Sequence, residues 1–148
     1  MTAVRSAITT RAIDAAALLA EVAASRNGAS VLFVGAVRDS NDGRDVSGIE
    51  YTAYAAMAEN EMAKIISEAA DHFDTVDIVV EHRVGRLAIG EASVVIAVAH
   101  PHRAQAYEAS RYIIEALKKR VPVWKREEYL DGTRQWVDPT NSGEAALT

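Results

Sequence analysis

The residues best suited to chemistry are five cations that lie between Lys118 and Arg126 with no acid among them: Lys118, Lys119, Arg120, Lys125 and Arg126. The chain of 148 residues has a net charge of −5, and without these five cations it has 11 basic and 21 acidic residues. A lysine near other cations has a lowered pKa because its charged form is disfavoured, which makes it a better nucleophile or base. The segment is therefore a candidate site for lysine chemistry or for binding an anion.

Two lysines of this segment also have a simpler explanation. Lys118 and Lys119 close a predicted helix, where cations stabilise the helix end without any other role. Lys125 and Arg126 follow on a predicted strand, where neighbouring residues point to opposite faces, so that one of the two should face inward. The spacing by itself leaves the choice between a catalytic and a structural lysine open.

A second candidate site lies at the start of the same helix, which is predicted to begin at Pro101. His102 and Arg103 fall in its first turn, where a positive charge opposes the helix dipole. Free backbone N–H groups at a helix start favour anions, so these two side chains predict a phosphate or carboxylate site. The alternative is that they turn away and pair with Glu81 or Glu91.

The length of this helix separates the two candidate sites. His102 and Lys118 are sixteen positions apart, which is about 24 Å along a helix. Both residues of one chain therefore cannot contact one small substrate. Either they serve separate sites, or two subunits bring the start of one helix to the end of another, which predicts a dimer with a composite pocket.

The elements that must position these residues indicate a mixed α+β domain with three main helices and about seven short strands. Helices are predicted over 14–27, 58–73 and 101–121, the first capped by Asp14. The segment 38–45 is polar and rich in turn residues, and it is interpreted as a mobile surface loop. Residues 1–137 are expected to form a single catalytic domain and 138–148 a flexible tail. The strands are predicted at the edge segment 4–9 and at 30–37, 49–54, 76–84, 93–99, 124–129 and 133–137.

Composition excludes several classes of function. The chain has no cysteine, which excludes disulfides, thiolate metal sites and a mechanism that uses the protein's own thiol. Its acidic balance argues against nucleic-acid binding, and the absence of a long apolar run or a leader predicts a cytoplasmic protein that does not contact membranes. His82, His100 and His102 match no metal-binding motif, so no metal and no cofactor are expected.

Several separated motifs resemble, in the same order, the catalytic large subunit of molybdopterin synthase, over about residues 4–137. The motifs are Gly35-Ala36-Val37-Arg38-Asp39, Glu50-Tyr51, Met57-Ala58-Glu59, His82-Arg83-Val84-Gly85, Ile89-Gly90-Glu91, His102-Arg103, Leu117-Lys118, Val121-Pro122-Val123-Trp124-Lys125-Arg126-Glu127, Asp131-Gly132 and Trp136-Val137.

This resemblance implies an α/β-hammerhead type of α+β fold and a homodimer that receives a small ubiquitin-like sulfur-carrier subunit at each end, making a heterotetramer. The carrier's C-terminal Gly-Gly, activated as a thiocarboxylate, would deliver two sulfurs to cyclic pyranopterin monophosphate and form the dithiolene of molybdopterin. Carried over by motif, Lys118 and Lys125 would be catalytic. Arg38, His102 and Arg103 would bind the substrate phosphate, the last two from the neighbouring subunit.

Two other classes of function compete with this interpretation. One is a non-catalytic module that only docks a carrier's tail, and the other is a sensor of a phosphate ligand. The complete set of five site residues argues against the docking module, because a scaffold needs no such convergence of cations.

Overall fold

The protein is described here by a computed structural model over residues 3–137; the predicted tail 138–148 lies outside the described residues. The predicted α+β class is confirmed, with three helices and nine strands in place of about seven. The helices are α1 (Ala15–Val22), α2 (Ala55–Phe73) and α3 (Arg103–Arg120). The strands are β1 (Val4–Thr9), β2 (Ala29–Ala36), β3 (Ser40–Asn41), β4 (Arg44–Ala53), β5 (Asp77–Arg83), β6 (Gly85–Ala88), β7 (Ala92–His100), β8 (Val123–Tyr129) and β9 (Arg134–Val137).

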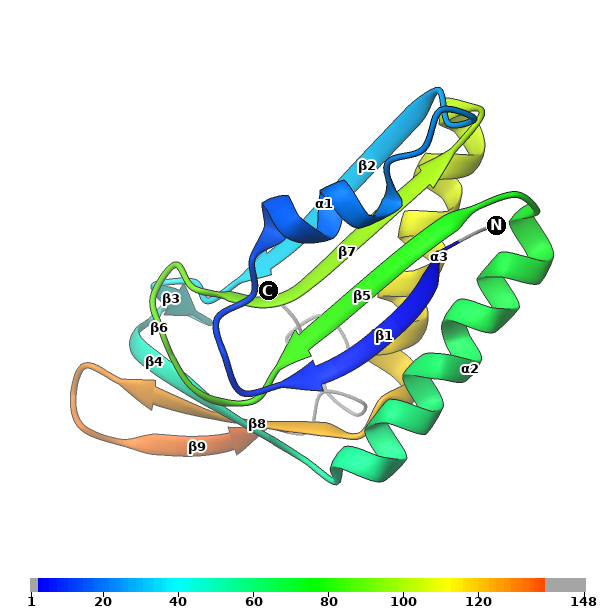
Figure 1. The fold of residues 1–148 in the computed structure, drawn as a ribbon. Coiled ribbons are helices and arrows are strands. Elements are labelled where there is room, and N and C mark those ends of the chain that lie inside the picture. Colours follow the sequence, from blue (N-terminus) through cyan, green and yellow to red (C-terminus); the bar gives the residue numbers. More distant parts are fainter. Residues whose placement is uncertain (1–2, 138–148) are drawn as a thin grey trace.

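The first sheet has the strand order β1-β5-β7-β2, with β1 parallel to β5 and the other neighbours antiparallel. Helix α1 packs on one face through Leu18 and Val22, and α2 and α3 cover the other face (Figure 1). Strand β7 is buried from Ser93 to His100, because a central strand with helices on both faces must be apolar on both faces. As predicted, β1 is an edge strand.

The second sheet carries the cationic segment. Its order is β3-β4-β8-β9, with β6 also paired to β4, and it lies at one end of the first sheet (Figure 1). Antiparallel pairing of β4 with β8 places Tyr51 opposite Lys125. The turn Asp131-Gly132 joins β8 to β9, as its sequence predicted.

The prediction of a mobile loop over 38–45 is wrong. Ser40 and Asn41 form β3 and pair antiparallel with Asp45 and Arg44 of β4. Asp42 and Gly43 have φ of 50° and 76°, the left-handed values that a tight two-residue hairpin requires. The segment is therefore an ordered hairpin, and it holds Asn41 at a fixed place in the second sheet.

Two predicted helix boundaries are also wrong. Asp14 caps α1 as predicted, accepting from the Ala17 N–H at 3.1 Å, but α1 ends at Val22 because the Asn27 side chain binds the Val22 carbonyl at 3.1 Å. Helix α3 begins at Arg103 and not at Pro101, with His102 as its N-cap residue. The reason is that the His100 ring accepts the His102 N–H at 2.9 Å and holds Pro101 in a bend.

The close approach of Gly28 to this bend makes a prediction about stability. A Cβ atom at Gly28 would lie 2.6 Å from the Pro101 carbonyl oxygen, a backbone atom. Gly28→Ala should therefore lower the free energy of unfolding by about 1–3 kcal/mol, the usual cost of overpacking, as measured by urea denaturation. Ser25→Ala, at an exposed position three residues earlier, is the control and should change it little; equal stabilities of the two variants would contradict the prediction.

Candidate functional site

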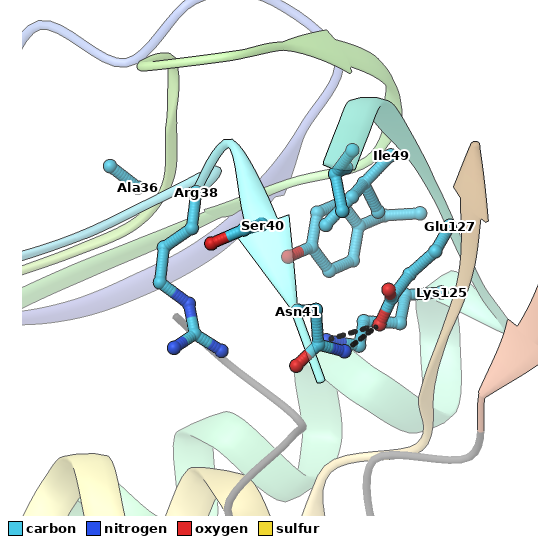
Figure 2. Close-up of a pocket in the computed structure, with 9 residues that line it drawn as sticks. Ala36, Arg38, Ser40, Asn41, Ile49, Lys125 and Glu127 are labelled. Carbon is cyan, nitrogen blue, oxygen red and sulfur yellow. Dashed lines mark hydrogen bonds and ion pairs between the residues drawn. The ribbon is translucent and has the colours of Figure 1, made fainter. Parts of the chain in front are cut away.

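A small pocket opens between the end of β2 and the second sheet, and it contains two of the predicted site residues. Arg38 follows β2, the hairpin strand β3 supplies polar side chains, and Lys125 comes from β8 (Figure 2). Strands from three parts of the sequence therefore meet at this pocket. Its lining residues are Ala36, Arg38, Ser40, Asn41, Val46, Ile49, Tyr51, Lys125 and Glu127.

Lys125 is the inward-facing member of its strand, as alternation predicted: it is 3% exposed, whereas Trp124 is 43% exposed. Burial lowers the pKa of Lys125, the nearby charge of Glu127 raises it, and the charges of Arg38 and Lys118 lower it further. The predicted direction of the shift is confirmed, but its main cause is burial rather than the neighbouring cations. The same interactions bring Lys118, Lys125 and Arg38 within electrostatic range of one another.

Glu127 is a residue of the pocket that the sequence analysis missed. Its carboxylate is 1% exposed, lies 3.3 Å from the Lys125 ammonium and accepts a hydrogen bond from Asn41 at 2.7 Å (Figure 2). It also accepts a hydrogen bond from the Tyr129 hydroxyl at 3.1 Å. A buried carboxylate needs such partners. The spacing in the sequence could have identified it, since Lys125 and Glu127 are two residues apart on one strand and therefore point to the same face.

The five cations of the segment separate into two groups. Lys125 lines the pocket, and Lys118, in the last turn of α3, lies close enough for its charge to lower the pKa of Lys125. Arg120 instead binds Glu61 at 2.7 Å and Glu68 at 2.6 Å on the surface of α2. Arg126 pairs with Glu50 on β4. Lys119 is exposed. The segment is thus not a uniform basic patch, because only Lys125 of the five lines the pocket.

His102 and Arg103 are exposed at the opposite end of α3 and are not in the lining of this pocket. The alternative, that these two side chains pair with Glu81 or Glu91, is wrong because both carboxylates bind other residues. Glu81 binds Arg5 at 2.9 Å and Arg11 at 3.5 Å, and Glu91 binds Arg83 at 3.0 Å. Within one chain, the start of α3 remains about 22 Å from Lys118. The structure therefore brings Arg38, Lys118 and Lys125 together and leaves His102 and Arg103 apart from them.

His100 fixes the direction in which α3 begins. Its ring is 4% exposed; one nitrogen accepts the His102 N–H at 2.9 Å and the other lies 3.0 Å from the Phe73 carbonyl, to which it donates.

His82 is also buried, and burial lowers its pKa to about 4. Among residues 3–137, no group of three or more His, Cys, Asp or Glu side chains is arranged to hold a metal ion. No helix in the same range is long and apolar enough to cross a membrane.

Comparisons with known proteins agree with this geometry. The family described as MoaE protein matches residues 8–120. The molybdopterin synthase catalytic subunit of Pyrococcus abyssi is 44% identical over 120 residues, which is 81% of this chain and 80% of that protein. The one of Emericella nidulans is 42% identical over 118 residues, or 80% of this chain, which spans only 60% of that longer protein.

Two solved structures have the same fold. Molybdopterin synthase from Staphylococcus aureus superposes with a TM-score of 0.84 at 35% identity, covering 88% of this chain and 95% of that one. A protein–protein complex of subunits 1 and 2 of molybdopterin-converting factor from Helicobacter pylori matches with a TM-score of 0.74 at 26% identity, covering 89% of each chain. The likeness confirms the fold that the sequence motifs implied.

Proposed function

The chain belongs to the MoaE protein family, and from this premise we propose that it is the catalytic subunit of a molybdopterin synthase. In this role it transfers two sulfurs from a thiocarboxylated small carrier subunit to cyclic pyranopterin monophosphate. The observation that carries the proposal is the buried Lys125, held by Glu127 beside Arg38 and Lys118. The chain has no thiol of its own, so the sulfur must arrive on the carrier.

The chemistry follows from the charges of the pocket. A thiocarboxylate and a cyclic phosphate are both anions, and preorganised cations in a partly dry pocket stabilise negative charge that develops during the reaction. Lys118 acts as general acid and base or as electrostatic anchor at the acyl carbon and the pterin side chain. Lys125 and Arg38 stabilise the developing negative charge, and Glu127 is a positioning residue for Lys125.

The substrate phosphate also requires His102 and Arg103, which lie too far from Lys118 along α3 to serve the same site within one chain. They are supplied by a second copy of the chain in a homodimer. Each end of that dimer binds one carrier subunit, which gives a heterotetramer. In support, the Helicobacter pylori structure is a complex of two different subunits.

The proposal extends to the organisation and location of the protein. Residues 1–137 act as a single catalytic domain, and the protein works in the cytoplasm without a metal or a cofactor of its own. Fractionation of cells that produce the chain at its native level tests the location. Recovery of the protein from the membrane fraction or from outside the cytoplasm would contradict it.

The direct test is reconstitution. The purified chain, thiocarboxylated carrier and cyclic pyranopterin monophosphate should together form molybdopterin, and leaving out the carrier should abolish the product. A docking module would retain a Gly-Gly-ended carrier in a pull-down yet form no product. A phosphate-ligand sensor would bind a nucleotide in calorimetry and ignore the carrier, so the three functions give different results.

Glu127 provides a prediction about pH dependence. Because Glu127 raises the pKa of Lys125 against the lowering by burial, Glu127→Gln should lower that pKa further. The charged ammonium is then lost at a lower pH, so the alkaline limb of the pH–rate profile should move to lower pH. Glu128→Gln is the matched control, since Glu128 binds Arg86 at 2.9 Å and lies 3.5 Å from Arg126, away from Lys125. If the alkaline limb of the Glu127→Gln profile stays at the wild-type pH while circular dichroism shows an intact fold, the reaction does not depend on a charged Lys125.

A further inference from the structure

The turn between β6 and β7 carries the motif Ile89-Gly90-Glu91, which has no role in the proposed function. The turn lies beside the end of β2, from which the chain continues to Arg38 (Figure 1). Two backbone hydrogen bonds join the two segments. The Gly90 N–H donates to the Val37 carbonyl at 2.9 Å, and the Val37 N–H donates to the Glu91 carbonyl at 3.0 Å. The turn therefore binds both polar backbone groups of the residue that precedes Arg38.

Arg38 depends on its backbone for its place in the pocket. Strand β2 loses its regular register with β7 near its end, and an irregularity of this kind bends a strand. Beyond it, the β6–β7 turn binds Val37, and the Asp39 carbonyl accepts the Val46 N–H at 2.8 Å. Within residues 3–137, no ion pair holds the exposed Arg38 side chain (Figure 2). The backbone anchors on its two sides therefore fix the point from which Arg38 reaches the pocket.

The Glu91 side chain closes this turn and ties it to the first sheet. One carboxylate oxygen accepts the Ala88 N–H at 2.8 Å, and the other accepts a hydrogen bond from Arg83 at 3.0 Å. The Ala88 N–H and the Arg83 guanidinium lower the pKa of Glu91, because both favour the charged carboxylate. Arg83 ends β5, an inner strand of the first sheet, and its side chain is only 16% exposed. Glu91 therefore fastens the turn to a well-buried part of the sheet.

We propose that Glu91 is a positioning residue for Arg38: it closes the β6–β7 turn, and the turn holds Arg38 where its guanidinium can bind the anions of the reaction. The role in the reaction rests on the proposed function, whereas the placement of Arg38 near Lys125 does not. Glu91 is not among the residues that line the pocket, so it acts through the backbone of Val37 and not by contact with a substrate.

The first test is the pKa of Lys125, which reports the position of Arg38 because the charge of Arg38 lowers it. Glu91→Ala should raise this pKa, since the guanidinium is no longer held nearby. Loss of the carboxylate charge by itself could only lower it. Carbon-13 NMR of the lysine Cε atoms measures it, with only four lysines in the chain. An unchanged or lower pKa of Lys125 in Glu91→Ala overturns the proposal.

Glu21→Ala is the matched control for this variant. The Glu21 side chain is 41% exposed, as is that of Glu91, and it also binds an arginine, Arg5, at 2.9 Å. The control removes the same charge and a similar ion pair but no contact with the β6–β7 turn. It should leave the pKa of Lys125 at its wild-type value, and a rise equal to that of Glu91→Ala would contradict a specific role of Glu91.

The second test separates the placement of Arg38 from a general loosening of the pocket, which would also raise the pKa of Lys125 by exposing it to water. Arg38→Ala alone should raise this pKa. If Glu91 acts through Arg38, adding Glu91→Ala to Arg38→Ala should raise it no further. A further rise in the double variant would mean that Glu91 supports the whole pocket, and it would rule out the positioning role.

Gly90→Val tests the same turn without removing a charge, and it decides the question if Glu91→Ala fails to fold. Gly90 has a φ of 85°, a value that a β-branched residue rarely adopts. The turn should therefore shift and the pKa of Lys125 should rise, as in Glu91→Ala. A folded Gly90→Val with the wild-type pKa of Lys125 overturns the proposal.

The third test is the reconstituted reaction. Glu91→Ala should lower the single-turnover rate of molybdopterin formation about tenfold or more, a usual cost of a misplaced binding group, and Glu21→Ala should not. If the wild-type chain forms no molybdopterin while the pKa of Lys125 responds as expected, the proposed function fails and the placement of Arg38 by Glu91 stands. If the wild-type chain is active and Glu91→Ala changes neither the rate nor this pKa, only the positioning role is rejected.

Discussion

Lys118→Ala should reduce molybdopterin formation by about a thousandfold or more, while carrier binding stays measurable. The physical reason is that Lys118 is the cation at the end of α3 that acts on the pocket of Arg38 and Lys125, and loss of an acid–base or charge-stabilising group costs factors of this size. The measurement is the single-turnover rate with thiocarboxylated carrier, together with calorimetric titration of the carrier.

Lys119→Ala is the matched control for this variant. Lys119 is the next residue on the same helix and is exposed, so its loss removes the same charge from the chain but no group from the pocket. Its rate should stay within a few-fold of wild type. Turnover of Lys118→Ala at a rate near that of Lys119→Ala would rule out the catalytic assignment.

A mixture of two inactive variants should recover activity if the site is composite. Lys118→Ala and Arg103→Ala, each impaired alone, would form mixed dimers after subunit exchange. In a mixed dimer, one site has an intact Lys118 from one copy and an intact Arg103 from the other. With equal amounts and random pairing, half of the dimers carry one good site of two, so activity should reach about a quarter of wild type.

The control for this experiment is the double variant that carries Lys118→Ala and Arg103→Ala in one chain. Mixed with wild type, it forms dimers in which each site lacks one of the two residues, so it should lower activity rather than rescue it. Recovery near zero in the first mixture, with subunit exchange verified by mass spectrometry, would mean that each site is built within one chain.

Much of the fold was accessible from the sequence because its signals are local. The stripe of α2, the Asp14 cap of α1 and the Asp131-Gly132 turn each depend on residues a few positions apart. The errors arose where distant contacts overruled local preference. Helix α3 begins later and α1 ends earlier than predicted, because His100 and Asn27 bind backbone groups at those ends. The 38–45 segment is an ordered hairpin because β3 pairs with the start of β4.

The sequence by itself determined the chemical inventory: a cluster of cations in an acidic chain, no thiol, and a helix too long for both of its ends to contact one substrate. Only the tertiary structure decided which cations work together. The pairing of Tyr51 with Lys125 and the hydrogen bond from Asn41 to Glu127 join residues 74 and 86 positions apart, and burial at that junction sets the pKa of Lys125. Burial and strand register depend on the whole folded chain, so no local spacing can specify them.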